Sequence, residues 1–444
     1  MRKHIKKEII EIFKTILEAH RRIKDLVRTA DTSNLVTLLQ DCQDAAISVG
    51  NMIEESEGEG TDAVKYLEEY CELLFQFSKG SENSIGKLDS CINNCIQEIY
   101  TFRETKEIVF LPYKASMWDS LESVWKKADE DPDGTAVVIP IPYYDKNPDG
   151  SFKEVHYEGD QFPSDVPIVN YNDYNFEQRH PDEIYIHNPY DEYNLVTSVH
   201  PFFYCPHLKE LTDKLIYIPY FVLAEAKPDN EKYLKSIEHF VTVPGVVWAD
   251  EVIVQSPSMA KAYVKIASKW FKEAGNKEMA DRKIWEAKIK GAGSPKIEKL
   301  KAMAIEEQNL PDEWLKIVER SDGSRKKIML FTNSVKSLLK YEDRMVEKLR
   351  RVLNAFYENR EDIALLWRPH PLIRATIESM HPELWEAYSN LVDEYIQGGW
   401  GIYDDTSDMD RALVVSDAYY GDGGSLLQLY RELKKPIMYL DVEV

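Results

Sequence analysis

The chain has 444 residues, of which 43% are hydrophobic and 30% charged, a composition typical of a soluble globular protein. Its 55 Lys and Arg against 77 Asp and Glu give a formal net charge of −22, which argues against a general nucleic-acid binder because such proteins need a basic surface. No stretch reaches the roughly 18 apolar residues of a transmembrane helix, and the N-terminus lacks the apolar core of a signal peptide. We therefore expect a cytoplasmic protein of two or three domains.

Residues 1–105 are expected to form four amphipathic helices joined by short polar connections. In the first helix, apolar residues recur at alternating steps of four and three, the spacing of a helix that packs along a narrow seam. Similar spacing recurs from Leu35 to Met52 and from Ile85 to Phe102, and a further helix spans roughly 61–77. Short connections place consecutive helices antiparallel, so the sequence predicts an antiparallel helical bundle.

The first helix is basic, with nine Lys or Arg against four Asp or Glu among residues 1–28. One interpretation is a patch that contacts anionic lipid headgroups, which would place the protein at the inner face of the membrane. The other is a solvated face of a bundle helix, or a homodimer contact made through residues 1–105. The narrow apolar seam fits a partner helix and favours the second interpretation.

The five cysteines show no spacing typical of zinc ligands. Cys91 and Cys95 are four residues apart on one predicted helix, with no histidine partner nearby in the sequence. We therefore expect reduced thiols that pack in the core.

From Lys106 the apolar period changes to that of strands. Strands are expected at 107–112, 136–141, 166–169, 183–186, 215–218 and 251–254, with helices between them. Strands that alternate with helices predict a parallel sheet, so residues 106–290 are expected to form one Rossmann-like domain. The stretch 143–165, rich in Asp, Gly, Pro and Tyr, is expected to be irregular.

Residues 291–444 repeat the α/β pattern after a boundary at Gly291 to Pro295. Strands are expected at 327–331, 363–367, 401–403, 413–415 and 436–440, and helices near 341–358, 372–396 and 424–433. The predicted fold class is thus α/β: a helical bundle, then two Rossmann-like domains. Glycosyltransferase-B enzymes have this two-domain outline, although other two-domain α/β enzymes share it.

Two loops near the C-terminus carry the clearest chemical signal. One predicted strand ends in Arg368-Pro369-His370-Pro371, and about fifty residues later Asp422-Gly423-Gly424-Ser425 opens a helix. A helix N-terminus offers unpaired N–H groups to an anion, and glycines allow the backbone to approach it closely. We predict that Arg368, His370, Gly423, Gly424 and Ser425 bind a diphosphate. Asp422 either joins them or only caps the helix.

Five motifs in order resemble the CDP-glycerol glycerophosphotransferase family, which includes the teichoic-acid polymerases and primases. They cover roughly residues 240–444 and comprise Trp248 to Ser256, Gly293 to Leu300, Ile328 to Ser334, Arg368 to Pro371, and Ser416 to Ser425 followed by Lys435-Pro436. The resemblance implies a glycosyltransferase-B enzyme that takes CDP-glycerol, or another nucleotide diphosphate ester, as donor. It also implies a polyol-phosphate or glycan acceptor in cell-wall synthesis, and no obligatory cofactor or metal.

The sequence departs from the family at two places. A Trp-His-Gly motif, whose histidine is the family's proposed base, has no counterpart where the chain reads Tyr217 to Phe221. Gly423-Gly424 replaces the usual Tyr-Ser and resembles the phosphate loop of non-hydrolysing UDP-N-acetylglucosamine 2-epimerases, although Gln428 stands where those enzymes have a glutamate. The alternatives are therefore a nucleotide-sugar transferase or epimerase, and a non-catalytic nucleotide-binding scaffold assembled through the bundle.

The acceptor hydroxyl needs a base within hydrogen-bond reach. The candidates are His187, at the end of a predicted strand, and His200, before a predicted helix start. Other residues expected at the cleft follow predicted strands: Lys114, Ser116, Thr332, Asn333 and Ser334.

Overall fold

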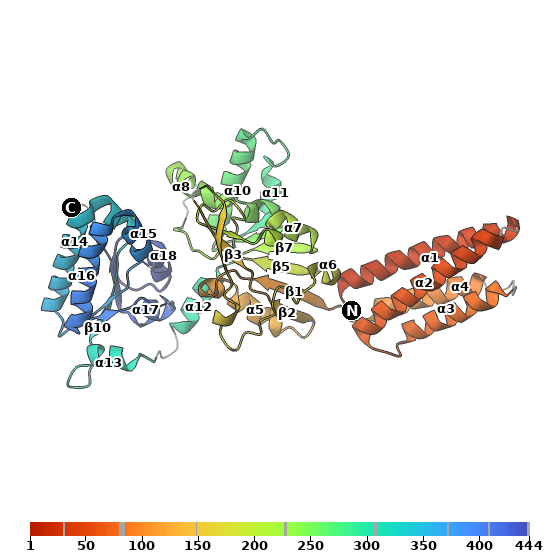
Figure 1. Cartoon of the computed structure of the whole chain (residues 1–444), viewed down its shortest axis with the longest axis horizontal. Coiled ribbons are helices and arrows are strands. Elements are labelled where there is room, and N and C mark those ends of the chain that lie inside the picture. The colour runs from red at the N-terminus through yellow and green to blue at the C-terminus, as the bar shows by residue number, and fades with distance from the viewer. Residues whose placement is uncertain are drawn as a thin grey trace.

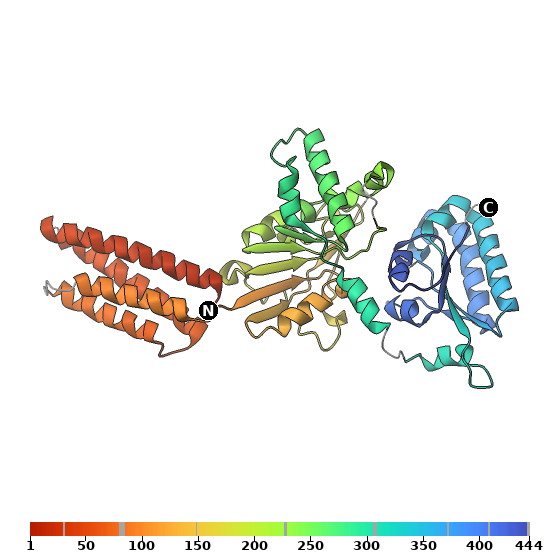
Figure 2. The same ribbon diagram turned by 180° about the vertical axis from the view of Figure 1, so that it is seen from behind.

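The computed structural model describes residues 1–29, 32–79, 85–147, 149–225, 229–304, 309–370, 373–406 and 409–441. Three bodies follow one another along the long axis: a helical bundle, a middle α/β domain and a C-terminal α/β domain (Figure 1). The view from behind shows the same order, so the bundle and the C-terminal domain lie at opposite ends of the molecule (Figure 2).

The bundle packs four helices around one apolar core that includes Ile9, Phe13, Val49 and Ile92. These residues lie on the seams whose spacing follows the helical repeat, so each helix buries one face and solvates the other. Several basic residues of the first helix, among them Lys7, lie on the solvated face. The helices are α1 (Lys3–Thr29), α2 (Thr32–Glu57), α3 (Asp62–Ser78) and α4 (Ile85–Thr101).

A buried polar chain crosses the bundle core. His20 of α1 is completely buried, and its Nδ1 lies 2.7 Å from the Asp89 carboxylate of α4. A carboxylate only accepts, so the neutral ring carries its proton on Nδ1, and Nε2 accepts from the Tyr70 hydroxyl of α3 at 2.7 Å. Burial lowers the pKa of His20, with Asp89 opposing the shift. These bonds join three helices at one level and so favour one alignment of the bundle.

The middle domain is built on a six-stranded parallel sheet in the order β2-β1-β5-β7-β8-β9. Alternate residues of β1 face opposite sides, with Val109 and Leu111 in one core and Ile108 and Phe110 in the other. Burial of both faces explains why these strands read as continuous apolar runs. The strands are β1 (Lys106–Leu111), β2 (Gly134–Val138), β5 (Glu183–Ile186), β7 (Lys214–Tyr217), β8 (Glu251–Ile253) and β9 (Ile289–Lys290).

Helices cover this sheet. They are η1 (Ala115–Ser120), α5 (Glu122–Asp129), η2 (Gly159–Gln161), α6 (Phe176–Arg179), η3 (Pro201–Phe203), α7 (Cys205–Glu210), α8 (Glu231–Val241), α9 (Pro244–Trp248), α10 (Pro257–Glu273) and α11 (Arg282–Lys288). Strand β1 begins beside the bundle, where Thr105 pairs with Arg2, and runs away from it. The carboxyl ends of the parallel strands therefore point toward the C-terminal domain (Figure 1).

The C-terminal domain holds a five-stranded parallel sheet in the order β12-β11-β10-β13-β14. Its strands are β10 (Lys327–Thr332), β11 (Ile363–Trp367), β12 (Ile402–Tyr403), β13 (Ala418–Gly421) and β14 (Ile437–Tyr439). Its helices are α13 (Asp312–Val318), α14 (Val335–Glu358), α15 (Ile373–Met380), α16 (Pro382–Gly398), α17 (Met409–Val415) and α18 (Ser425–Glu432). The two parallel α/β sheets are consistent with a glycosyltransferase-B-like fold.

Helix α12 (Pro295–Met303) joins the two α/β domains (Figure 2). Its Ile297 and Leu300 pack in the core of the C-terminal domain. Its Lys296, almost completely buried, forms an ion pair of 2.8 Å with Asp119 of the middle domain. A buried charge without its partner is costly, so this pair fixes where α12 meets the middle domain.

The structure corrects several predictions of local structure. Residues 413–415 end helix α17 instead of forming a strand, and the strand at this place is β13. Residues 166–169 make only an isolated bridge to β2. The stretch 143–165 contains an antiparallel hairpin, β3 (Tyr143–Lys146) and β4 (Phe152–His156), which pairs with β6 (Thr197–Val199) in a separate sheet. The helix expected at 372–396 is two helices, α15 and α16.

All five cysteines are free thiols, and all but Cys71 are buried. Among the helices of the described residues, none is both long and apolar enough to cross a lipid bilayer.

Tyr70→Phe should lower the free energy of unfolding of the bundle by roughly 1–3 kcal/mol, because the buried Nε2 of His20 loses its hydroxyl donor. Tyr66→Phe is the matched control, since Tyr66 lies on the same helix and is only partly buried. Urea unfolding of the full chain, followed by far-ultraviolet circular dichroism, measures the difference. Equal unfolding of the two variants would show that the polar chain does not stabilise the bundle.

Candidate functional site

Strand order locates the binding crevice in each α/β domain. In an open parallel sheet, ligands bind at the carboxyl ends of the two strands where the strand order reverses. In the middle domain these strands are β1 and β5, and in the C-terminal domain they are β10 and β13. Each domain therefore has one expected crevice, and the residues at these two places can be compared directly.

In the C-terminal domain, Asp422 connects the two sides of the crevice. One carboxylate oxygen of Asp422, after β13, accepts the Ser334 N–H at 3.0 Å and the Ser334 hydroxyl at 2.6 Å, after β10. Asp422 is buried to 9% exposure, so these bonds form away from bulk water and hold the loops firmly. Ser334 also caps α14 through a hydrogen bond from Ser337 N–H. Asp422 is thus a loop-bridging residue.

Below this bridge the strands are packed closely. Thr332 Oγ1 lies 2.5 Å from the Tyr419 hydroxyl, which also donates to the Asp422 carbonyl at 3.3 Å. A Cβ on Gly421 would lie 2.3 Å from Thr332 Oγ1, so only glycine fits there. Thr332 is therefore part of the floor of the crevice.

The loop after β11 is held to the loop after β10. The His370 N–H donates to the Asn333 carbonyl at 3.2 Å. The Asn333 side chain is buried, and its Oδ1 accepts the Trp367 indole N–H at 2.8 Å. Asn333 therefore positions the loop of His370 from below. Pro371 and the Ser425 side chain lie outside the described residues.

His370 lies close enough to Asp422 for the two charges to interact. Burial lowers the pKa of His370, and the negative charge of Asp422 opposes that shift. In the free protein the imidazole is therefore held toward its neutral form. An anion bound nearby would add negative charge and favour the protonated form.

Arg368 is used mainly to hold the loop after β12. One guanidinium nitrogen forms an ion pair of 2.5 Å with Asp404, and the other terminal nitrogen donates to the Thr406 carbonyl at 2.6 Å. Each bond uses one of the two N–H groups of a terminal nitrogen, so Arg368 holds this loop and still has other N–H groups beside the cavity that it lines.

Gly423 and Gly424 are exposed in the loop after β13, and the fold itself does not require glycine at either position. Neither has a positive φ, and a Cβ on either would meet nothing within 4 Å. Gly424 is extended, with φ −167° and ψ −173°, and forms the N-cap of α18. A pair of glycines that the fold does not need, directly before a helix, leaves room for a ligand to approach the backbone.

A cavity of about 420 Å³ opens beside His370, on the side of β11 and β12. Its size is that of a pocket for a small molecule. The walls include Trp385, Tyr403 and Asp405. Aromatic rings with a neighbouring carboxylate suit a flat, polar ring system such as a nucleobase with its ribose.

The crevice of the middle domain is filled by a histidine. His187, after β5, is completely buried and lies edge-on to Tyr113 and Tyr220. Its Nε2 accepts the Tyr113 N–H at 3.1 Å, so its Nδ1 donates to the Ser120 hydroxyl at 2.8 Å. Burial lowers its pKa to about 3. This corrects the expectation that His187 faces the cleft, because both ring nitrogens are occupied inside the domain.

The remaining predicted residues lie elsewhere on the middle domain. Lys114 is half-buried, with its ammonium 4.8 Å from the centre of the Tyr143 ring, and Ser116 is exposed in η1. His200 caps η3, where its Nδ1 accepts the Phe202 N–H at 3.2 Å. It lines a surface cavity with Tyr171 and Phe203.

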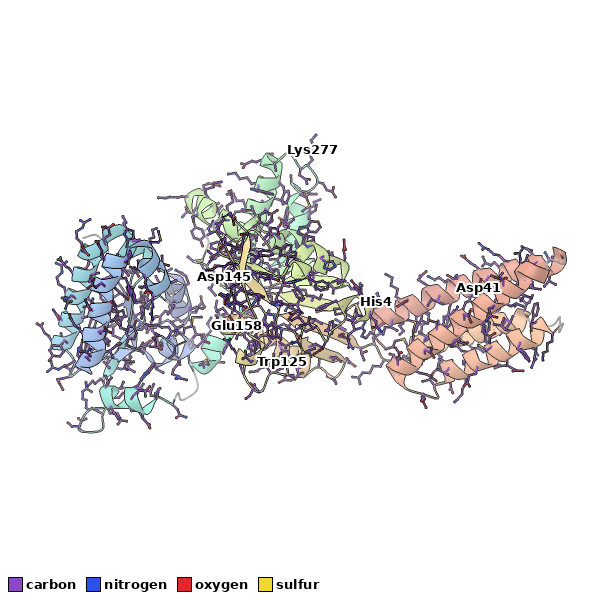
Figure 3. All side chains as sticks on the ribbon, viewed as in Figure 1. His4, Asp41, Trp125, Asp145, Glu158 and Lys277 are labelled. Atoms are coloured by element: carbon purple, nitrogen blue, oxygen red, sulfur yellow. The ribbon has the colours of Figure 1, made fainter. Side chains whose placement is uncertain are left out.

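The structure adds a polar group that the sequence did not single out. In the β3–β4 hairpin, His156 Nε2 lies 2.9 Å from an Asp145 carboxylate oxygen, so its Nδ1 keeps the lone pair of the neutral ring. Glu158 accepts the Tyr143 hydroxyl at 2.6 Å and the Ala115 N–H at 2.8 Å, which ties the hairpin to the loop of Lys114. Asp145 and Glu158 lie in the half of the middle domain that faces the C-terminal domain (Figure 3).

The strand pairing explains why the sequence did not reveal this dyad. Tyr143 pairs with His156 across the hairpin. This register places the His156 side chain beside Asp145, eleven positions earlier in the chain. The region reads as a loop, and only the pairing register makes the two side chains neighbours. The useful signal would have been the apolar and aromatic residues at both ends of the stretch.

No protein-family model matches the sequence, and no curated protein matches it. Solved structures match its fold over about three quarters of the chain. MnaA of S. aureus in complex with UDP shares 14% identity and a TM-score of 0.44, over 76% of this chain and 79% of that one. The UDP-GlcNAc 2-epimerase of Methanocaldococcus jannaschii shares 11% and 0.42, over 75% and 83%.

A UDP-forming α,α-trehalose-phosphate synthase of Burkholderia xenovorans shares 11% identity and a TM-score of 0.35, over 76% of this chain and 83% of that one. Identities at this level concern the fold alone. At TM-scores this low, the likeness carries no argument about site or activity.

His187→Ala should destabilise the middle domain by about 3 kcal/mol or more, because it leaves the buried Tyr113 N–H without its acceptor, removes the donor to the Ser120 hydroxyl and opens a cavity. The folded pKa of about 3 lies below the unfolded value of about 6.5, so the unfolded state binds more protons in between. The stability that His187 contributes should therefore be present above about pH 6.5 and be lost as the pH falls toward 3.

Thermal unfolding of wild type, His187→Ala and His200→Ala from pH 7.5 to 4 measures this effect. His200→Ala is the control, since His200 is only half-buried. A His187→Ala protein that melts like wild type would contradict the structural role.

Proposed function

We propose that the chain is a transferase whose C-terminal domain binds the diphosphate of a nucleotide-activated donor in the crevice between β10 and β13. The observation that carries this proposal is the Gly423-Gly424 turn. The fold has room for side chains at both positions and needs no positive φ at either. A ligand that approaches the backbone explains the two glycines better than the local structure does.

The charges of the crevice suit a diphosphate. The N-terminus of α18 presents unpaired N–H groups and the positive end of the helix dipole. His370 adds a cation when the ligand favours its protonation. Asp422 is the one carboxylate in the bridge, and its two hydrogen bonds from Ser334 offset its charge toward the ligand. The nucleoside would occupy the cavity beside His370, between Trp385 and Tyr403.

The donor that we favour is CDP-glycerol, because the five motifs in order resemble the glycerophosphotransferases. In the reaction, an acceptor hydroxyl oxygen attacks the phosphorus next to glycerol. A new O–P bond forms, the bridging P–O bond breaks, and CMP leaves with the bond electrons. Developing charge on CMP would be stabilised by the α18 N–H groups and His370. The acceptor would be a polyol phosphate or a glycan of a cell-surface polymer.

The acceptor proton needs a base, and the Asp145–His156 dyad is the best candidate among the described residues. Asp145 holds the Nε2–H of His156, and the free lone pair on Nδ1 is able to accept a proton. The protonated imidazole would then be stabilised by the same carboxylate. His187 cannot take this role in the folded domain, since both of its ring nitrogens are already bonded.

Turnover separates the proposal from its alternatives. Purified protein is incubated with CDP-glycerol or UDP-N-acetylglucosamine, each with and without a polyol-phosphate acceptor. Release of CMP supports the glycerophosphotransferase, release of UDP a glycosyltransferase, and formation of an epimer an epimerase. Nucleotide binding without turnover indicates a scaffold, and absence of any nucleotide binding would overturn the site.

Gly423→Ala should weaken nucleotide binding at least about tenfold, because the new methyl group prevents close approach of the diphosphate. The melting temperature should stay near that of wild type, since a Cβ at this position meets nothing within 4 Å. Calorimetric titration with CDP-glycerol and UDP-N-acetylglucosamine measures the affinity.

The matched control is Gly86→Ala, which also adds a methyl group in open space but lies in the bundle. If Gly423→Ala binds nucleotide as wild type does, the glycine turn is not the diphosphate site.

Nucleotide affinity should increase as the pH falls from about 8 to about 6, because the bound diphosphate raises the lowered pKa of His370 and binding takes up a proton. CDP-glycerol is a suitable probe, since its esterified diphosphate has no group that titrates in this range. In His370→Gln the affinity for CDP-glycerol should no longer change with pH over this range. If the affinity of this variant still rises as the pH falls, the proton taken up on binding goes to a group other than His370.

A further inference from the structure

The joint between the bundle and the middle domain brings together two histidines and an aspartate. His4 lies near the start of α1, at the point where the bundle meets the middle domain (Figure 3). His180 follows α6, and Asp213 precedes β7. The three residues come from segments far apart in the sequence, so only the docking of the bundle onto the domain places them together.

The potential ligand atoms of these residues all lie within 4.8 Å of one another. Asp213 Oδ1 lies 3.5 Å from His180 Nε2 and 4.0 Å from His4 Nδ1. Four ligands around a zinc ion at bond lengths of about 2.0–2.1 Å are about 3.3 Å apart. The three side chains are partly or largely exposed, so the rings have space to rotate until their nitrogens converge on one ion, and water would supply the fourth ligand.

The backbone already holds His180 and Asp213 in place. His180 has a left-handed conformation, with φ 39° and ψ 71°, and its N–H donates to the Phe176 carbonyl at 2.9 Å. The Thr212 hydroxyl donates to the Pro181 carbonyl at 2.7 Å, and this bond is buried. Since Pro181 follows His180 and Thr212 precedes Asp213, a single hydrogen bond fixes the spacing of two of the three residues.

The third residue, His4, is held through Arg2. Arg2 forms an ion pair of 2.6 Å with the buried Glu107 of β1, and also donates to the His180 carbonyl at 3.2 Å. The Lys6 N–H donates to the Arg2 carbonyl at 3.0 Å, so the first turn of α1 is regular at this place. The position of His4 relative to His180 is therefore set before any metal binds, which reduces the ordering that binding requires.

The types of the three side chains indicate which ion they suit. The two imidazoles stack with their centres 4.0 Å apart and their planes at 20°. A neutral imidazole is the form that binds a metal ion. Two imidazoles and one carboxylate suit Zn²⁺, Co²⁺ or Ni²⁺ better than Mg²⁺ or Ca²⁺, which prefer oxygen ligands.

We propose that His4, His180 and Asp213 bind one divalent transition-metal ion, with zinc as the best match, and that this ion fastens the bundle to the middle domain. The site is independent of the proposed transferase activity, because the bundle lies at the opposite end of the molecule from the C-terminal domain (Figures 1 and 2). Its occupancy would therefore change how firmly the bundle is attached and leave nucleotide binding unaffected.

A second cluster in the described residues needs to be distinguished from this one. Asp145, Glu154 and His156 of the β3–β4 hairpin also place their ligand atoms within 4.8 Å of one another. That group has one histidine and two carboxylates, so it is a poorer match to zinc. The five free thiols are a further possible source of zinc binding and must be identified by their spectrum.

The test is titration of the tag-free full chain with Co²⁺ and Zn²⁺, in wild type, His180→Ala, Asp213→Asn and the control His239→Ala, whose histidine is exposed on α8. We expect one ion per chain in wild type and in the control, and affinity lower by more than about tenfold in the two site variants. The Co²⁺ complex should show d–d bands without the near-ultraviolet band of thiolate ligands. Binding should weaken in acid, because protons compete with the metal ion for the ligand atoms.

A second measurement tests the fastening. Zinc should slow proteolytic release of the bundle, and this protection should be absent in His180→Ala, whose nucleotide binding should remain that of wild type. Three results would each overturn the proposal: absence of metal binding by wild type, equal binding by His180→Ala and wild type, or a thiolate band in the Co²⁺ spectrum. Loss of binding in His156→Ala, with binding retained in His180→Ala, would move the site to the hairpin.

Discussion

The bond between Asp422 and Ser334 is the interaction on which the candidate site depends. It spans the one place in the C-terminal sheet where the strand order reverses, so it joins two loops that a parallel sheet would otherwise leave separate. Because the carboxylate is buried and accepts two hydrogen bonds, it fixes the position of the Gly423-Gly424 turn that precedes α18. The loop of His370 is held to the loop of Ser334, because the His370 N–H donates to the carbonyl of Asn333, the residue before Ser334.

The two α/β domains use equivalent places in different ways. In the middle domain His187 fills the crevice, bonded to Tyr113 and Ser120, so this position contributes rigidity. In the C-terminal domain the corresponding loop carries Gly423 and Gly424, where an added Cβ would meet nothing within 4 Å. Helix α12 connects the two domains: its Lys296 forms a buried ion pair with Asp119 of the middle domain, and its apolar residues pack in the C-terminal domain.

Much of the fold could be predicted from local patterns in the sequence, and the predictions that were wrong have physical causes. Strand β10 and strand β11 were predicted nearly to the residue because both of their faces are buried, which forces continuous apolar runs. Residues 413–415 are equally apolar, but they pack as the last turn of α17, since a short apolar run fits a buried helix as well as a strand. The β3–β4 hairpin was missed because half of its residues are polar and its edge is solvated.

The sequence by itself determined the alternation of helices and strands, the placement of the Asp-Gly-Gly-Ser motif before a helix, and the free thiols, because all three follow from spacing along the chain. Tertiary structure alone decided the roles of individual side chains. It buried His187, committed Arg368 to Asp404, paired Asp145 with His156, and brought His4 to His180 and Asp213. Each of these depends on contacts between residues distant in sequence, and burial and hydrogen-bond partners are properties of such contacts and not of the local pattern.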